Sequence, residues 1–367
     1  MNAIVNNAEM VLSTKPDYDF PGLIKRGVYF GMPDHEYHAE PSLSASGIKK
    51  ILVSPMDYWA TSWMNQTRQD ERTSDAMDLG TAYHKRILEG RAAFQANYAA
   101  AIDPDDYPDA IRTVDDLKSA LDVLAVPYKS TLKKPDLIQL LLDKDPDAPI
   151  WDNIISSHAR AHDGLDFLPA KQIERIELAA AMIERHPQLG KAFTGGYPEV
   201  SVFWIDAESN LPMKARIDYL KIALISDLKT FTNPQEMPID RAIYRAMASR
   251  KYHVQSVVYS WAVEAISGFI RTGNVHGEVD KDWLAKFDAF KGERPFLFVF
   301  QQTGNAPIAR GYILPRQSVW GVGETQARSA IVTFENCWKT FEADPWIDLS
   351  NIQSFDDTGF PVYMSEG

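Results

Sequence analysis

The sequence contains very little cysteine. Of its 367 residues only Cys337 is a cysteine, which excludes an internal disulfide framework and any metal or iron–sulfur site that needs four cysteines. A chain that uses no disulfides is typical of a reducing compartment, so we expect a cytoplasmic protein.

Long apolar runs are also missing. No stretch approaches 18 apolar residues, so we expect no transmembrane helix and no membrane partner. The N-terminal segment MNAIVNNAEMVLSTKPDYDF has no basic start followed by an apolar core, and we therefore do not expect it to be a secretory signal. No internal repeat is visible.

A basic excess is absent as well. The 38 basic and 50 acidic residues give a formal charge of −12, which argues against broad, non-specific attraction to nucleic acid. A locally basic groove remains possible. Part of the acidic excess could belong to a metal site, whose charge is cancelled when the cation binds.

What the chain does contain is the patterning of a globular protein with both helices and strands. Apolar spacing predicts helices over 42–64 (interrupted at Ser54-Pro55), 76–90, 170–186, 240–268 and 316–343. Alternating apolar and polar residues predict three strands within 198–230 and a hairpin over 294–315. We expect a loosely ordered lead-in over 1–27 and a C-terminal tail over 346–367.

Residues 104–149 differ in composition from the rest of the chain. They are rich in Asp, Lys and Pro and carry two short amphipathic patterns, TVDDLKSALDVLAV and KKPDLIQLLLDK. The first opens with a Thr…Asp capping signature, and Pro135 suits the first turn of the second. We interpret this segment as a small helical module inserted into one larger domain, which is formed by 28–103 and 150–345.

The stretch ALISDLKTFT (223–232) holds the first chemical signal. Because side chains alternate along a strand, Asp227 and Lys229 point to the same face. Either they form an ordinary ion pair on a solvated face, or they converge with another group. Asp218 lies nine residues earlier on the preceding strand, and a hairpin between the two strands would place it beside Asp227.

Two adjacent carboxylates repel each other, and each holds its proton more tightly. A divalent cation removes that conflict, and hard oxygen ligands suit Mg²⁺ or Mn²⁺. A lysine beside such a metal can position or deprotonate a water molecule, although Lys229 could also simply pair with Asp227. Glu199, at the start of the preceding strand, is either a further ligand or an exposed strand end.

The pattern Asp218…Asp227-Leu228-Lys229 resembles the core of the PD-(D/E)XK nuclease superfamily. Three more segments resemble its exonuclease branch: LSASGIKKILVSPMDYW, LGTAYHKRILEG and KYHVQSVVYSWAV. Together they resemble the RecE/exonuclease VIII-like group of phages and prophages, which is related to the RecB nuclease domain and lambda exonuclease. The resemblance spans about 29–310 apart from the insert, and Ile217 stands where the superfamily's name has a proline.

This resemblance implies an α/β (α+β) fold of the restriction-endonuclease type, with a central mixed sheet flanked by helices. It implies Mg²⁺, for which Mn²⁺ can substitute, held by His84, Asp218, Asp227 and the backbone of Leu228. Gln255 and Tyr259, four apart on one helix, would contact phosphates or Lys229, unless they are ordinary helix positions. The implied reaction is hydrolysis of double-stranded DNA ends, 5′ to 3′, leaving a 3′ single strand.

The resemblance also implies partners. Relatives form homo-oligomeric rings around the duplex and work with a single-strand annealing protein (RecT-like) in a bacterial host cell. Candidate phosphate contacts in the main domain are Arg216, Arg245, Arg250 and Lys251. The alternatives are a nuclease of different polarity or substrate, such as a RecB-like enzyme, and a catalytically silent DNA-binding or scaffold protein on the same fold.

The insert resembles the small SAP, HeH and Rho-N-type helical modules, several of which bind nucleic acid. Lys129, Lys133 and Lys134 could then contact phosphates. The other interpretation is a lid or a protein-contact module, and the sequence does not decide between the two.

Overall fold

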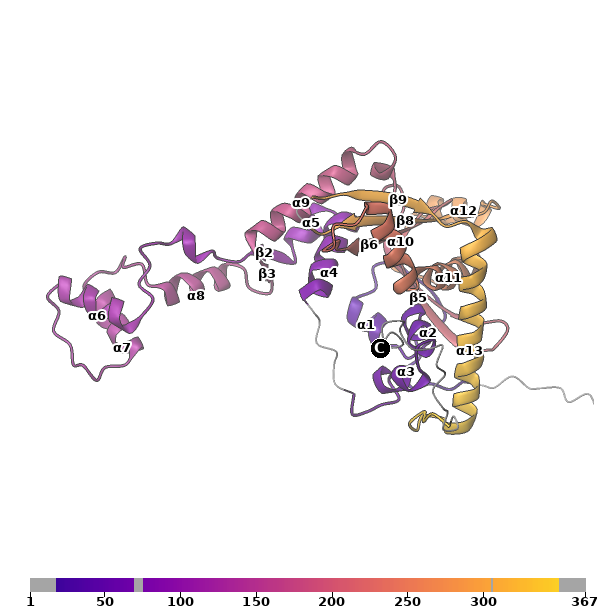
Figure 1. Ribbon diagram of the computed structural model, residues 1–367, viewed down its shortest axis with the longest axis horizontal. Helices are drawn as coiled ribbons and strands as arrows, with labels where there is room; N and C mark the ends of the chain where they lie inside the picture. The colour runs from indigo at the N-terminus through magenta and orange to yellow at the C-terminus, as the bar shows by residue number, and fades with distance from the viewer. Residues whose placement is uncertain (1–17, 69–74, 305, 350–367) are drawn as a thin grey trace, which may run out of the picture.

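A mixed seven-stranded sheet forms the centre of the computed structural model, which describes residues 18–68, 75–304 and 306–349 (Figure 1). The strand order is β7-β1-β4-β5-β6-β8-β9. These strands are β1 (Gly27–Tyr29), β4 (Tyr197–Ile205), β5 (Pro212–Leu220), β6 (Ile225–Phe231), β7 (Val275–His276), β8 (Phe296–Gln302) and β9 (Ala309–Ile313). β1 pairs with β7 and β6 with β8 in parallel, and the other neighbours are antiparallel. The predicted α/β class with a mixed sheet flanked by helices is confirmed.

Helices cover both faces of the sheet. In the main domain they are α1 (Asp34–Ala39), α2 (Ala45–Ile51), α3 (Pro55–Thr61), α4 (Asp75–Leu88), α5 (Arg91–Gln95), α9 (Ala170–Arg185), α10 (Ile239–Ser249), α11 (Tyr252–Thr272), α12 (Lys281–Ala289) and α13 (Gly321–Phe341). Two short helical segments, η2 (Leu189–Lys191) and η3 (Arg316–Trp320), complete it. No helix among the described residues is long and apolar enough to cross a membrane.

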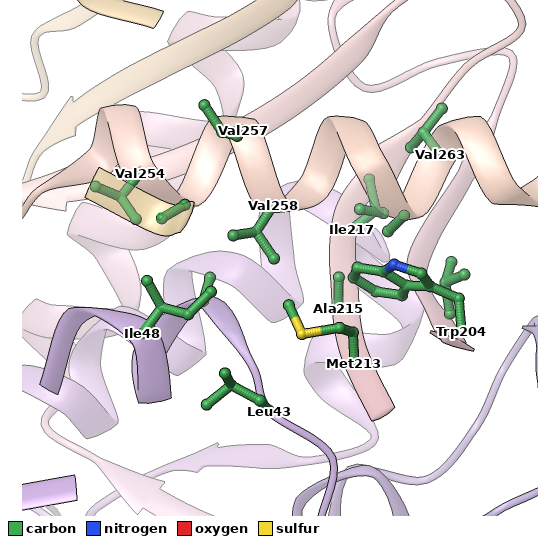
Figure 2. Close-up of a cluster of buried hydrophobic side chains, with 14 of the residues drawn as sticks. Leu43, Ile48, Trp204, Met213, Ala215, Ile217, Val254, Val257, Val258 and Val263 are labelled. Atoms are coloured by element: carbon green, nitrogen blue, oxygen red, sulfur yellow. The ribbon is translucent and has the colours of Figure 1, made fainter. Parts of the chain in front are cut away.

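The largest hydrophobic core lies between the sheet and the helices α2, α11 and α13. Figure 2 shows part of it, with Ile48 of α2 and Val254 and Val258 of α11 facing Ala215 and Ile217 of β5. A smaller core on the other side joins Leu88 of α4 and Ile183 of α9 to Leu228 and Val299 of the sheet. Because both sides are covered, all nine residues of β5 are buried, including its charged ones.

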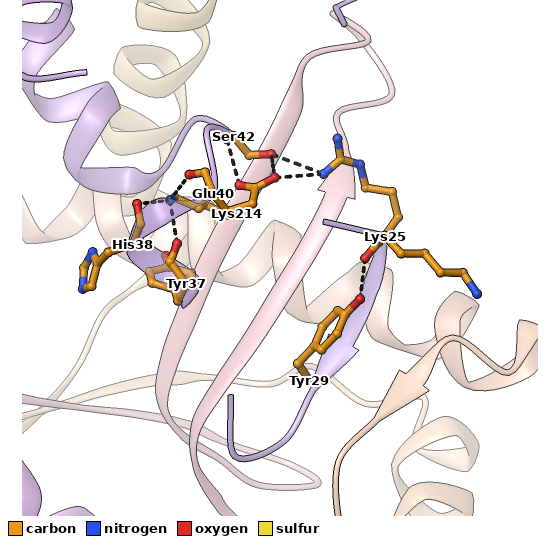
Figure 3. A network of polar contacts seen from close by, with 8 residues as sticks. Lys25, Tyr29, Tyr37, His38, Glu40, Ser42 and Lys214 are labelled. Atoms are coloured by element: carbon orange, nitrogen blue, oxygen red, sulfur yellow. Dashed lines mark hydrogen bonds and ion pairs between the residues drawn. The ribbon is translucent and has the colours of Figure 1, made fainter. Parts of the chain in front are cut away.

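Lys214 of β5 is held by α1 and the residues that follow it. The Lys214 ammonium donates to the backbone carbonyl oxygens of Tyr37, His38 and Glu40 (Figure 3). The Glu40 carboxylate in turn accepts from the Ser42 hydroxyl at 2.7 Å and forms an ion pair with Arg26. These contacts satisfy polar groups that burial would otherwise leave unpaired.

The inserted segment forms a separate helical module. It contains η1 (Pro104–Asp106), α6 (Val114–Val123) and α7 (Lys134–Leu142), and Figure 1 shows α6 and α7 at the end of an arm that projects from the sheet domain. The arm is built by α8 (Trp151–Ala161) and the two-stranded pair β2 (Tyr98–Ala100) and β3 (Asp166–Leu168). The module has its own apolar core of Leu117, Leu121, Leu137, Leu141, Ala148 and Ile150.

Two boundary predictions are wrong. Residues 18–27 are not a loose lead-in, because Tyr18 and Phe20 are buried in the main core, where Phe20 packs on Trp338. Trp346, assigned to the tail, is also buried, against Tyr58 and Phe334. Residues 1–17 and 350–367 lie outside the described part of the chain. The cause is the same at both ends: large aromatic side chains gain more by burial than a polar sequence context suggests.

The single long helix predicted over 240–268 is also wrong. The chain forms α10 and α11, and Lys251 between them has a left-handed φ of 49°. A left-handed residue ends a helix by satisfying its last carbonyls, here through the N–H groups of Arg250 and Lys251. This residue is usually glycine, so the sequence carried no signal for the break.

Candidate active site

The candidate site lies where β5 and β6 part. The two strands pair only at Tyr219 with Ser226 and Leu220 with Ile225. Beyond that point the carboxylate of Asp218 takes the place of a ladder partner and accepts from the Leu228 N–H at 2.9 Å. The hairpin therefore places Asp218 on the strand beside Asp227, and the place where the two strands part is called the notch below.

Asp227 is completely buried and held from two sides. Its Oδ1 accepts from Gln255 Nε2 of α11 at 3.0 Å, and its Oδ2 lies 2.5 Å from the Lys229 ammonium. At this distance the Lys229 ammonium is the ion-pair partner of Oδ2. A buried carboxylate oxygen of this kind is a good acceptor for a cation.

His84 reaches the same notch from α4. Its Nδ1 lies 3.7 Å from Asp218 Oδ2, and its ring also interacts with the backbone of Leu228. Burial and the nearby Lys229 ammonium lower the pKa of His84 to about 4. The imidazole is therefore neutral at neutral pH, which is the form that binds metals.

The three acids lie on three neighbouring strands. Pro198 pairs with Tyr219 and Val200 with Ile217, so the register places Glu199 of β4 opposite Asp218 of β5. Glu199 itself has a left-handed φ of 50°, which distorts the strand at this point. Strain of this size persists where the surrounding structure enforces it, and it is common at functional sites.

The acids repel one another. Burial and the Asp218 carboxylate raise the pKa of Glu199 to about 8, and the same two causes raise the pKa of Asp227. Burial raises the pKa of Asp218 as well. Shifts of this kind mark a site that lacks positive charge in its metal-free form.

Lys229 and Tyr259 complete the buried cluster. Burial acts against the Lys229 ammonium, but the carboxylates of Asp227 and Asp218 outweigh it and raise the pKa of Lys229. Tyr259 lies on the same helix as Gln255, and burial together with Asp218 raises the pKa of its hydroxyl well above the usual value. Both predicted α11 residues therefore face the acids.

The donor set fits a divalent cation in chemistry, although it is not closed around one. Among the described residues, no three His, Cys, Asp or Glu side chains already converge as a metal site. Two donors that share an ion at about 2.1 Å lie roughly 3–4 Å apart, and the 3.7 Å between His84 and Asp218 falls in that range. Asp227 would complete the set if its Oδ2 exchanged the Lys229 ammonium for the ion.

A groove of about 1120 Å³ borders the site, and His84, Glu199 and Arg216 lie in its lining. Acidic residues outnumber basic ones around it, since Asp34, Glu89, Asp166, Glu199 and Glu278 face only Lys85 and Arg216. A second cavity of about 260 Å³ lies at the other end of the site, next to Thr230, and contains Arg245 and Arg250. The basic groups therefore gather on the α10 side of Lys229.

The residues predicted to contact phosphates differ in their exposure and in the internal contacts that they already make. Arg216 is almost buried, and its guanidinium is bound to Asp34, to Ser201 and to the carbonyls of Met32 and Pro33. Arg245 and Arg250 are exposed, and Arg245 donates to Gln235 at 2.8 Å. Lys251 forms the left-handed link between α10 and α11.

The lysines predicted to contact DNA on the module are remote from the notch. Lys133 is exposed at the start of α7, while Lys134 forms an ion pair with Asp152 at 2.8 Å. Figure 1 shows α7 at the far end of the arm, away from β6. Lys133 and Lys134 therefore take no direct part in the chemistry at Asp227.

Sequence reasoning missed two residues of the site, Lys49 and Tyr252. Lys49 of α2 donates to Gln255 Oε1 at 3.4 Å, and the ring of Tyr252 lies 5.6 Å from the Lys49 ammonium and 5.1 Å from that of Lys229. Lys49 lies in the segment LSASGIKKILVSPMDYW and Tyr252 in KYHVQSVVYSWAV. No local pattern distinguishes either residue from the neighbouring helix positions. Only the packing of α2 on α11 brings Lys49 to the site.

Comparisons with known proteins add little. No model of a known protein family matches the sequence, and no curated protein matches it significantly. Among solved structures, a protein from Eubacterium rectale described as a "Putative exonuclease" matches with a TM-score of 0.32 and 12% identity, over 65% of this chain and 88% of that chain. A similarity this low carries no argument about function, which must come from the site itself.

Proposed function

We propose that this protein is a metal-dependent nuclease that hydrolyses phosphodiester bonds of DNA. The observation that carries the proposal is the pair of acids on β5 and β6, where His84 lies 3.7 Å from Asp218 and the Lys229 ammonium pairs with Asp227. Carboxylates whose pKa values are raised by burial and by one another, with a specific charged partner beside them, mark a candidate functional site. Such a cluster is expected where a divalent metal supplies the missing charge.

Asp218, Asp227, His84 and the backbone of Leu228 would hold Mg²⁺ or Mn²⁺, with Glu199 near enough to hold a bound water. When bound, such an ion polarises a phosphate and lowers the pKa of water. Lys229, released from Asp227, would position the attacking water or offset the negative charge that develops on the phosphate. Gln255 keeps Asp227 oriented by donating to its Oδ1, and Tyr259 lies one turn further along the same helix.

The finer proposal concerns the substrate. The motif resemblance supports double-stranded DNA ends, cleaved 5′ to 3′, as part of recombination by strand annealing in a bacterial or phage setting. The exposed Arg245 and Arg250 beside Thr230 support a path for the phosphate backbone on the α10 side. A ring of subunits with an annealing-protein partner would place several such basic edges around one duplex.

The test is a nuclease assay on linear duplex DNA labelled at either the 5′ or the 3′ end, with Mg²⁺ and with a chelator. We expect Mg²⁺-dependent shortening that Asp227→Asn abolishes, while Asp282→Asn, an exposed aspartate on α12, leaves it unchanged. The label that is released first gives the polarity. Duplex binding without cleavage in any metal would show instead that the chain is a silent DNA-binding or scaffold protein, and cleavage by Asp227→Asn would refute the site.

A further inference from the structure

A chain of hydrogen bonds links α2 to the buried carboxylate. The Lys49 ammonium donates to Gln255 Oε1 at 3.4 Å, and Gln255 Nε2 donates to Asp227 Oδ1 at 3.0 Å. Gln255 is itself buried, with 7% of its surface exposed. The amide therefore bridges a cation and an anion with its two chemically different ends.

The bridge has only one favourable orientation. An ammonium group is a donor without an acceptor, and an ionised carboxylate is an acceptor without a donor. If the Gln255 amide turned over, its NH₂ would face the Lys49 ammonium and its oxygen would face Asp227. Both contacts would then be repulsive, so the charge of Lys49 selects the orientation that donates to Asp227.

The position of Lys49 is set by helix packing. The side chain of Ser44 accepts from the Gly47 N–H at the start of α2, and the buried Ile48 packs toward Val254 of α11 (Figure 2). The next residue, Lys50, points elsewhere and donates to Thr61 at 2.9 Å. Burial lowers the pKa of Lys49 to about 8, so the fold keeps this ammonium beside Gln255 at a cost.

We propose that Lys49 is a positioning residue of the active site, which fixes the amide of Gln255 and, through it, the carboxylate of Asp227. With Oδ1 held in this way, Oδ2 stays turned toward Lys229 and the notch. The catalytic consequence of Lys49 rests on the proposed nuclease function, whereas its structural consequence for Gln255 does not.

The kinetic test compares Lys49→Met with Lys50→Met as the matched control. Loss of a group that orients a ligand costs about 10–100-fold in activity, so we expect Lys49→Met to lower kcat by that factor with KM for DNA nearly unchanged. Lys49→Arg, which keeps the charge, should restore part of the rate, and Lys50→Met should behave as wild type. A raised KM with normal kcat would overturn the proposal, because it would make Lys49 a substrate contact.

A double-mutant cycle tests the route through Gln255. If Lys49 acts only by holding the amide, Lys49→Met added to Gln255→Leu should cost nothing more than Gln255→Leu alone. If the rate losses of the two single variants instead multiplied in the double variant, the two residues would act independently and the proposal would be contradicted.

A third measurement does not depend on activity. The side-chain amide signal of Gln255 in ¹⁵N NMR spectra, assigned by its loss in Gln255→Leu, should exchange slowly with solvent in the wild type. We expect faster exchange in Lys49→Met and no change in Lys50→Met, in protein without metal or DNA. Unchanged exchange in Lys49→Met would overturn the proposal even if the protein proves to be a nuclease, and the expected change would support it even if no cleavage is found.

Discussion

Two regions of the molecule differ in whether they bury charged groups: the notch between β5 and β6 does, and the helical module at the end of the arm does not. The buried core of the module is entirely apolar, and its charged residues lie outside it. In the notch, Asp227 and Asp218 are 0% and 7% exposed, beside apolar strands. The module buries only apolar side chains, which is the arrangement that stabilises a fold. The notch buries charged groups, which lowers stability and is not required for folding.

This difference shows where function is to be sought. A buried charge without full compensation lowers stability, so it persists where another requirement holds it in place. The module has no buried charged side chain among its described residues. If it binds a ligand, it must do so through residues on its surface.

The largest difference should appear when one lysine is removed from each region. Lys229→Met should lower the rate of cleavage by about 10²–10³-fold, as expected when a group that stabilises developing charge is lost. Lys133→Met, on the module, should leave the rate on a short duplex unchanged. The measurement is cleavage of the same labelled duplex by both variants, with thermal unfolding to show that both are folded. If both variants lost the same factor in cleavage rate, the catalytic role could not be assigned to the notch alone.

Cavity-forming substitutions should separate the two hydrophobic cores. Phe298→Ala in β8 and Leu121→Ala in α6 each remove a fully buried side chain, which costs about 2–5 kcal/mol. Phe298→Ala should destabilise the whole sheet domain, because its core is continuous. Leu121→Ala should accelerate amide hydrogen exchange only within the module, which has a core of its own. Faster exchange in β6 and β8 of Leu121→Ala would show that the two cores are coupled.

Excision of the module should have a smaller effect. Ile111 and Ile150 lie side by side, with the Ile111 N–H donating to the Pro149 carbonyl at 2.8 Å. Replacing 111–150 by a short Gly-Ser linker should keep the cleavage rate on a short duplex within about a factor of two, because adjacent chain ends can be rejoined without strain. Loss of cleavage, with the unfolding temperature retained, would assign the module a part in the reaction.

The smallest effect is a difference in pH dependence. Glu199 has a raised pKa, so between the ordinary value of 4.5 and about 8 the folded state holds a proton that the unfolded state releases. Its contribution to stability is therefore present below pH 4.5 and is lost as the pH rises toward 8. Asp116 in the module behaves oppositely, since hydrogen bonds from Thr113 lower its pKa and its contribution is lost as the pH falls below 3.8.

Urea unfolding of the metal-free protein at several pH values measures this difference. Glu199→Gln should make the decline between pH 4.5 and 8 shallower without removing it, because the pKa values of Asp218 and Asp227 are raised as well. Added Mg²⁺ should reduce the decline further by replacing the missing positive charge. Asp116→Asn should change only the acid side of the curve. A decline as steep in Glu199→Gln as in the wild type would show that Glu199 does not contribute to it.

Much of the fold was predictable because its signals are local. The alternation in β4, β5 and β6 and the two patterns of the module each depend on residues a few positions apart. Hairpin geometry then placed Asp218 near Asp227 without knowledge of the rest of the chain. The break at Lys251 and the burial of Tyr18, Phe20 and Trp346 were not predictable in this way, because distant packing partners decide them.

The sequence by itself determined the strand hairpin and the spacing of Asp218, Asp227 and Lys229, since side-chain direction in a strand follows from position alone. The tertiary structure decided which other groups join them. It brought His84 from α4, Gln255 from α11 and Lys49 from α2, and it placed the Arg216 guanidinium in internal contacts. The physical reason is that burial, and with it charge balance and pKa, is set by contacts between elements far apart in the chain.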